Sequence, residues 1–228
     1  MFAKETYEKR RAALKKSVGS GLLLFFGNEE CGMNYEDNTY HFRQDSTFLY
    51  FFGLNYAGLS AIIDIDEDKE IIFGNELTID DIVWMGTQPT LHEKAQLVGI
   101  HETRPTCELK KYIEKAVIKK QTVHYLPTYR AEHRIKLFHL LGIHPGADQP
   151  SVPFIRGVVN LRNYKTAEEI VELQRACEIT ADMHLTAMKV ARVGMKEYEV
   201  AAALEAVAQA AGCFVSFPTI ATVNGQTL

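Results

Sequence analysis

The hydrophobic and polar positions at the start of the chain predict a helix followed by a buried strand. Residues 4–18 are rich in charge, with Leu14 and Val18 one helical turn apart, which is typical of a helix with one apolar face. An uninterrupted apolar run then lies between Gly21 and Gly27. Its length and its glycine borders favour a buried strand.

A second group of strands is expected between residues 48 and 73. Residues 48–54 are strongly aromatic, and we predict a central strand there because aromatic side chains are enriched in strands. Residues 59–65 alternate, so that one face carries four apolar side chains: Leu59, Ala61, Ile63 and Ile65. A charged turn at 66–69 leads to a further strand at 70–73. Strands joined by short turns predict an antiparallel meander.

The hydrophobic period changes after residue 105. We expect Thr106 to be the N-cap of a helix, because helical spacing relates the apolar residues that follow it: Leu109, Tyr112, Ile113, Ala116 and Val117. Residues 123–126 read as a strand, and residues 131–141 as a helix that ends at Gly142. A meander followed by alternating strands and helices predicts an α/β fold, with one mixed β-sheet flanked by helices.

A domain boundary is expected between residues 145 and 160. Residues 145–151 hold two prolines and a glycine, which neither a helix nor a central strand accommodates. The predicted domains are therefore residues 1–160 and residues 161–228.

We expect this chain to contain only the beginning of the second domain. Thr166 and Glu169 have the spacing of a capping box, and the helix after them carries one apolar stripe: Ile170, Leu173, Cys177, Ala181, His184 and Met188. A second helix is predicted at 196–211 and a strand at 214–223. Two helices and one strand leave much apolar surface without a partner. We therefore expect partly exposed apolar faces and association into a dimer or larger oligomer.

Composition narrows the class of protein and its surroundings. The 228 residues are 46% hydrophobic and 24% charged, with a net charge of −4 and no basic face, so neither nucleic acid nor an anionic membrane is an expected partner. The start has no signal-peptide core, and no apolar stretch is long enough to span a bilayer. Four cysteines without C-x-x-C spacing favour a reducing, cytoplasmic location.

No catalytic or metal-binding motif stands out among the residues. His133 and His139 would lie about 240° apart around a helix, and with His144 they are better explained as solvated polar residues than as metal ligands. His184 lies on an apolar stripe, which favours a hydrogen-bonded core histidine. The chain also lacks a nucleophile elbow and a glycine-rich phosphate loop. We therefore expect no catalytic residue and no metal ligand in this chain.

Two places merit closer attention as candidate sites. A polar turn brings Arg43 and Asp45 to the start of the predicted aromatic strand, where a guanidinium–carboxylate pair could form. A network that holds the fold is the favoured interpretation of this pair. Trp84 is the only tryptophan in the chain. Its flat ring suits a core or an interface, and it also suits contact with proline rings.

The polar turn and the aromatic run together resemble a family signature. The residues that carry the resemblance are Tyr40-His41-Phe42-Arg43-Gln44-Asp45-Ser46, followed by Phe48, Tyr50, Phe51 and Gly53. They are similar to the N-terminal domain of aminopeptidase P, the Xaa-Pro aminopeptidase of the creatinase and prolidase (pita-bread metallopeptidase) family. Phe52 and Leu54 depart from the pattern, where Thr and Phe are usual. Three further segments fit the same family: residues 81–86, 161–180 and 217–221.

The resemblance implies a creatinase-type N-terminal domain, followed by the start of a pita-bread α+β catalytic domain. In this family two divalent metals, usually manganese, are held by two Asp, one His and two Glu. They activate a water that attacks the peptide bond before proline. The resemblance places all five ligands beyond Leu228, so we expect no metal bound to this chain and no activity from it alone.

The resemblance also implies what the N-terminal domain contributes. It assembles the homo-oligomer and narrows the entrance to the active site, so that the full-length enzyme takes short peptides with proline at position 2. Trp84 matches a family Trp-x-Gly position and is expected near the active-site mouth of a partner subunit, as a substrate-binding residue. Two alternatives stay open: an Xaa-Pro dipeptidase (prolidase), and a relative without metals that only binds peptides or proteins.

Overall fold

The computed structural model describes residues 1–144, 146–147 and 149–226, in two compact units, Met1–Tyr164 and Lys165–Leu228. Pro145 and Asp148, part of the predicted turn-rich stretch, lie outside the described residues. Each unit is considered by itself below.

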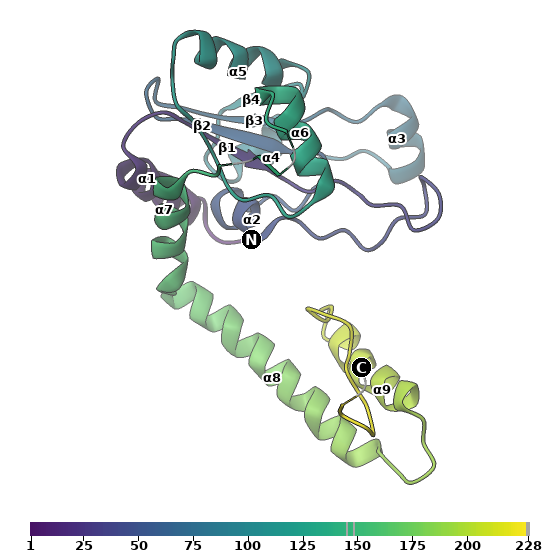
Figure 1. The fold of residues 1–228 in the computed structure, drawn as a ribbon. Helices are drawn as coiled ribbons and strands as arrows, with labels where there is room; N and C mark the ends of the chain where they lie inside the picture. Colours follow the sequence, from purple (N-terminus) through teal and green to yellow (C-terminus); the bar gives the residue numbers. More distant parts are fainter. Residues whose placement is uncertain (145, 148, 227–228) are drawn as a thin grey trace. The chain divides into compact units, whose positions relative to one another are not determined.

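A five-stranded mixed sheet forms the centre of the first unit (Figure 1). Its strands, in spatial order, are β4 (Glu102–Arg104), β3 (Lys69–Phe73), β2 (Ser60–Asp64), β1 (Leu22–Phe26) and β5 (Val123–Tyr125). The strands β1, β2 and β3 pair in antiparallel fashion, whereas β5 runs parallel to β1 and β4 runs parallel to β3. The predicted meander and the mixed α/β sheet are therefore confirmed.

Helices cover both faces of this sheet. On one face lie α1 (Lys4–Val18), α2 (Ser46–Phe52), α4 (Leu91–Gln96) and α7 (Val152–Asn163). The other face carries α5 (Glu108–Ile118) and α6 (Ala131–Leu141). Because both faces are covered, successive side chains of β1 enter opposite cores: Leu23 and Phe25 enter one, and Leu22 and Leu24 the other. Burial on both sides explains why β1 is apolar throughout.

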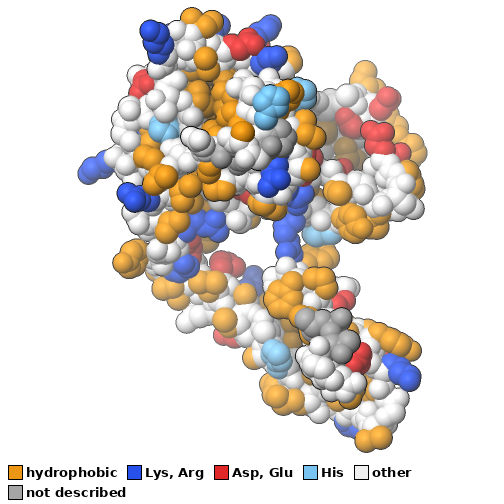
Figure 2. All heavy atoms as spheres, viewed as in Figure 1, with side chains coloured by type: hydrophobic (Ala, Val, Ile, Leu, Met, Phe, Trp, Pro, Cys, Tyr) orange, Lys and Arg blue, Asp and Glu red, His pale blue; other side chains and the backbone are white. Residues whose placement is uncertain are grey.

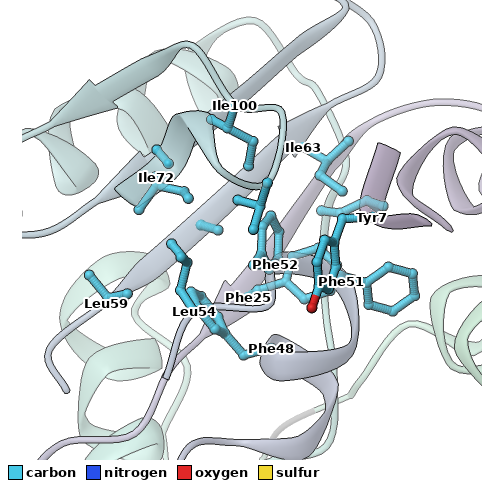
Figure 3. Close-up of a cluster of buried hydrophobic side chains, with 14 of the residues drawn as sticks. Tyr7, Phe25, Phe48, Phe51, Phe52, Leu54, Leu59, Ile63, Ile72 and Ile100 are labelled. Carbon is cyan, nitrogen blue, oxygen red and sulfur yellow. The ribbon is translucent and has the colours of Figure 1, made fainter. Parts of the chain in front are cut away.

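The aromatic run after the polar turn is a helix, so the predicted strand at 48–54 is wrong. Asp45 caps the start of α2, because its carboxylate accepts hydrogen bonds from the backbone N–H groups of Thr47 and Phe48, both at 2.9 Å. Gly53 ends the helix with a left-handed φ of 64°. Figure 3 shows the helical spacing of three phenylalanines, all turned into the core beside Phe25: Phe48, Phe51 and Phe52.

Two other predictions fail, and one helix was not predicted. Thr106 is not the N-cap of α5: the helix begins at Glu108, so Cys107 holds the N-cap position, and it makes no side-chain capping hydrogen bond. The helix α7 was not predicted, although the hydroxyl of Ser151 accepts from the N–H of Phe154 at its start and Pro153 lies in its first turn. Residues 214–223 do not form the predicted strand: in the described part of the chain they have no neighbouring strand to pair with.

A buried arginine fastens the first helix to the sheet and its neighbours. The guanidinium of Arg11 is fully buried and donates to the carboxylate of Glu70 at 2.7 Å. It also donates to three backbone carbonyls: those of Phe51 at 3.0 Å, Val98 at 2.8 Å and Gly99 at 3.4 Å. A buried charge needs such partners, because an unpaired one is strongly unfavourable. Arg11 thereby connects α1 with α2, β3 and the segment after α4.

The second unit consists of two helices and an irregular C-terminal segment. These are α8 (Ala167–Val190) and α9 (Glu197–Ala210), and the predicted capping box of Thr166 and Glu169 opens α8. No described residue of α8 is buried. Three apolar residues of its predicted stripe are exposed, as expected: Ile170, Leu173 and Met188.

Among the described residues, we find no helix that combines the length and the apolar character needed to cross a membrane.

Candidate functional site

The signature turn is organised by Gln44, a residue that the sequence analysis did not single out. Its side chain is 5% exposed, and all of its hydrogen-bonding capacity is directed at backbone. Its side-chain oxygen accepts from the backbone N–H groups of Asn28 at 2.7 Å and Asp45 at 2.9 Å. Its side-chain NH₂ group donates to the backbone carbonyls of Leu54 at 3.2 Å and Tyr56 at 2.8 Å. Gln44 therefore joins the segment after β1 to the segment after α2.

The two charged residues beside Gln44 both take part in hydrogen bonds that hold the turn. One carboxylate oxygen of Asp45 caps α2, as described above. The side chain of Arg43 is exposed, and its backbone carbonyl accepts from the side-chain amide of Asn28 at 2.7 Å. The fold-holding interpretation fits Asp45, whereas direct pairing of Arg43 with Asp45 stays a prediction.

Trp84 lies on a short helix that buries none of its residues. The helix α3 (Ile79–Met85) stands to one side of the sheet in Figure 1 and is capped by Thr78 and Asp81. Trp84 is 87% exposed, with Ile79 and Val83 nearly as open. Figure 2 shows the hydrophobic side chains of this region at the surface. A tryptophan that contributes nothing to the core of its own chain is a candidate for contact with a partner or ligand.

A cavity of about 370 Å³ adjoins the end of α3. Met85 contributes to its lining, opposite Tyr56 and Leu91. The ammonium of Lys94 lies over the Tyr56 ring, 4.2 Å from its centroid. Both carboxylate oxygens of Glu76 accept from the N–H of Leu91 at 3.0 Å. Glu76 and Lys94 give this apolar cavity one anionic and one cationic residue.

The histidines do not form a metal centre in the described part of the chain. His133 is 4% exposed, and its Nε2 lies 3.1 Å from the carbonyl of Gly27. Burial lowers the pKa of His133 below its ordinary value. His139 and His144 instead lie beside the Phe138 ring. No group of three or more His, Cys, Asp or Glu residues that could hold a metal occurs among the described residues.

His184 is exposed on α8, so the expected hydrogen-bonded core histidine is not found in this structure. The reason is the same as for its helix: the described residues bury no side chain of α8.

Two family models match the chain in succession. The first, "Aminopeptidase P, N-terminal domain", matches residues 7–125, and the second, "Metallopeptidase family M24", matches residues 171–228. The chain is 25% identical to the Xaa-Pro aminopeptidase of Escherichia coli K12 over 211 residues, which is 87% of this chain and 47% of that protein. It is also 25% identical to the human Xaa-Pro dipeptidase over 199 residues, 81% of this chain and 37% of that protein.

Solved structures give the same picture of the fold. Aminopeptidase P from E. coli, in its low-pH form, superposes with a TM-score of 0.76 at 23% identity, over 93% of this chain and 50% of the other. Proline aminopeptidase P II from Yersinia pestis also superposes with a TM-score of 0.76, at 22% identity, over 92% of this chain and 51% of the other. At these identities the likeness establishes the fold.

The fold and the two family matches define a class of protein: an N-terminal α/β domain followed by the start of a metallopeptidase domain. The family model covers more than half of the chain. The chain belongs to the family of the aminopeptidase P N-terminal domain, and it spans about half the length of the E. coli relative that it matches.

Proposed function

We propose that this chain is the N-terminal part of a metal-dependent Xaa-Pro aminopeptidase, which removes the first residue of a peptide when proline is second. The observation that carries the proposal is the order of the two family matches: an aminopeptidase P N-terminal domain at residues 7–125, and then the start of a family M24 metallopeptidase domain at residues 171–228. The resemblance of the Arg43-Gln44-Asp45 turn to the family signature supports it independently.

We propose that the metal ligands of such an enzyme lie outside this chain. The M24 match implies a divalent metal in the full-length enzyme, and we propose two, with manganese as the metal. Because the described residues hold no suitable cluster of ligands, we derive no catalytic step from them. The contribution that we propose for this chain is assembly and control of access to the site.

Hydrolysis of a quenched Xaa-Pro-Pro peptide with added Mn²⁺ tests the proposal. We expect the full-length parent to release the first residue and the 228-residue chain to be inactive under the same conditions. Activity of the chain alone would show that a site among its own residues has been missed. An inactive parent that still binds the peptide would move the assignment to the non-catalytic peptide-binding relative.

A dipeptidase is the second candidate, because the human Xaa-Pro dipeptidase matches the chain at the same 25% identity as the E. coli aminopeptidase. The two activities differ in the length of substrate that they accept. Full-length protein that cleaves Xaa-Pro dipeptides and leaves Xaa-Pro-Xaa tripeptides intact would establish the dipeptidase.

We also propose that α3 meets a partner subunit, as part of a cytoplasmic homo-oligomer. The 87% exposure of Trp84 and the apolar character of its helix support this placement. The free cysteines, of which Cys31, Cys107 and Cys177 are exposed, are compatible with a reducing compartment.

Replacement of Trp84 by alanine in the full-length enzyme tests the proposed contact. We expect KM for a short Xaa-Pro peptide to rise several-fold, or the oligomer to dissociate in light scattering, because the ring would no longer fill the interface. Tyr35→Ala, which removes another exposed aromatic ring, is the matched control and is expected to change neither quantity. An unchanged KM together with an unchanged oligomer for Trp84→Ala would contradict the proposal.

A further inference from the structure

A second cavity, of about 300 Å³, opens at the carboxyl ends of the parallel strands β1 and β5. Its lining comes from four parts of the chain: the end of β1, the start of α2, the segment at 126–129 together with His133 of α6, and the middle of α7. All of them belong to the first compact unit. The cavity is separate from α3 and its neighbouring hollow.

The sheet topology explains why a hollow forms at this position. The chain leaves β1 toward α2, which packs on one face of the sheet, and leaves the neighbouring β5 toward α6, which packs on the other face. Adjacent parallel strands whose connections diverge in this way leave a crevice between the two connections. In α/β proteins such crevices outside the carboxyl ends of strands are the places where small ligands bind.

The polar groups of this cavity are one carboxylate, one imidazole and four hydroxyls. Two of the hydroxyls, those of Ser46 and Thr47, accept hydrogen bonds from the guanidinium of Arg162 at 3.3 and 3.1 Å. Asp45 contributes a carboxylate, of which Oδ1 caps α2. His133 faces the Gly27 carbonyl with Nε2, which must therefore carry the proton. Its lowered pKa keeps the ring neutral near pH 7, so that Nδ1 is left as an acceptor. No lysine or arginine is among the lining residues.

Thr128 adds a hydroxyl that lacks a partner. Its Oγ1 is buried, and it forms no hydrogen bond within the described part of the chain. Buried polar atoms are nearly always hydrogen-bonded, so an unsatisfied one at the wall of a cavity indicates a group that a ligand or a water would complete.

The rest of the lining is aliphatic or aromatic, with Leu126 and Val159 on opposite elements. The volume lies at the lower end of the roughly 300–1,000 Å³ typical of small-ligand pockets. The occupant must therefore be small, carry an apolar group, and offer hydrogen-bond donors. Asp45 carries the one formal charge among the lining residues, and its carboxylate would repel a negatively charged ligand.

We propose that this cavity binds a primary ammonium compound with a short aliphatic side chain, of the size of a hydrophobic amino-acid amide. The ammonium would bind the carboxylate of Asp45, with Thr128 and His133 as further partners, and the side chain would lie against Leu126 and Val159. This inference does not depend on the proposed peptidase activity, because it concerns a site that the first unit forms alone.

Titration of the 228-residue chain with leucinamide, followed by NMR and calorimetry, tests the site. We expect saturable shifts for the amides of Thr128 and His133. N-acetyl-leucinamide, which lacks the ammonium, and 4-methylpentanoate, which has a carboxylate instead, are expected to bind at least tenfold more weakly. If leucinamide causes no saturable shifts at millimolar concentration, the cavity holds water only and the proposal is wrong.

Asp45→Asn separates charge recognition from helix capping. Asparagine caps helices as well as aspartate does, so we expect the variant to keep its fold while its affinity for leucinamide falls about tenfold or more. Asp81→Asn makes the same change at the capping carboxylate of α3, outside this cavity, and is expected to leave the affinity unchanged. Equal affinities in the parent chain and Asp45→Asn would overturn the proposed role of the carboxylate.

Discussion

Burial of the His133 imidazole is expected to make the first unit less stable at acidic pH. Burial disfavours its charged form and lowers its pKa, with the nearby ammonium of Lys136 acting in the same direction. In the unfolded chain the group titrates near its ordinary value, about 6.5. Between the folded and unfolded values the unfolded state therefore binds more protons, and the free energy of unfolding decreases as the pH falls through this window.

The corresponding test compares the parent chain with His133→Gln. Glutamine can still donate an N–H to the Gly27 carbonyl, but it does not titrate. We expect urea unfolding of the parent to lose more stability than the variant when the pH is lowered from 7.5 to 5. Parallel losses in the two proteins would show that another group is responsible for the acid sensitivity.

Single residues with unusual roles were the least predictable from the sequence. Gln44 and Arg11 both look like surface residues in a polar context, and both are buried because backbone carbonyls from distant segments converge on them. Those partners lie up to 88 residues away in the chain. No local pattern reports such convergence, whereas the role of Asp45 could have been predicted from its position before Thr47 and Phe48.

At the scale of elements, α2 depends on how its end fits against α1. Gly53 has a φ of 64°, and a Cβ placed on it would lie 2.4 Å from the ring carbon Cζ of Tyr7. Position 53 therefore requires glycine for two reasons: its backbone conformation is left-handed, and Tyr7 occupies the space that a Cβ would need.

We expect Gly53→Ala to lower the free energy of unfolding by more than about 2 kcal/mol, since backbone strain and overpacking add. Gly142→Ala is the matched control: Gly142 ends α6 with a similar φ of 70°, but a Cβ there would meet no atom within 4 Å. The control is expected to cost about 1 kcal/mol. Chemical denaturation of both variants checks the difference, and equal losses would contradict the proposed clash.

Elements were predictable where local signals and packing agree. The alternation of β2, the apolar run of β1 and the capping box of α8 were confirmed, because the strands follow from burial and the capping box from hydrogen bonds at the start of the helix. The helix α2 was misassigned because aromatic composition favours strands, while its caps and its i, i+3, i+4 spacing favour a helix. For α7, the prolines and glycine nearby concealed the N-cap at Ser151.

At the scale of the whole molecule, both hydrophobic cores belong to the first unit. Every buried member of the two clusters lies between Tyr7 and Val158, and α8 contributes none. Stability should therefore be divided unequally between the two units.

We expect a polypeptide of residues 1–164 to fold alone, with amide hydrogen exchange in β1 and β2 as slow as in the 228-residue chain. The amides of α8 in the longer chain should exchange much faster, because its helix is not supported by buried side chains. Hydrogen exchange measured on both polypeptides checks this. Loss of protection in β1 on removal of residues 165–228 would show that the second unit supports the sheet.

The short outer strands of the sheet have a consequence for the way in which copies of this protein can meet. The edge strands β4 and β5 each have three residues, β4 carries the charged Glu102 and Arg104, and Pro127 follows β5 closely. Short, charged or proline-flanked edges resist the addition of further strands from other molecules. The most apolar strand, β1, is enclosed between β2 and β5, so ordered assembly must use helices and loops, and the sheet itself is protected from growing into fibrils.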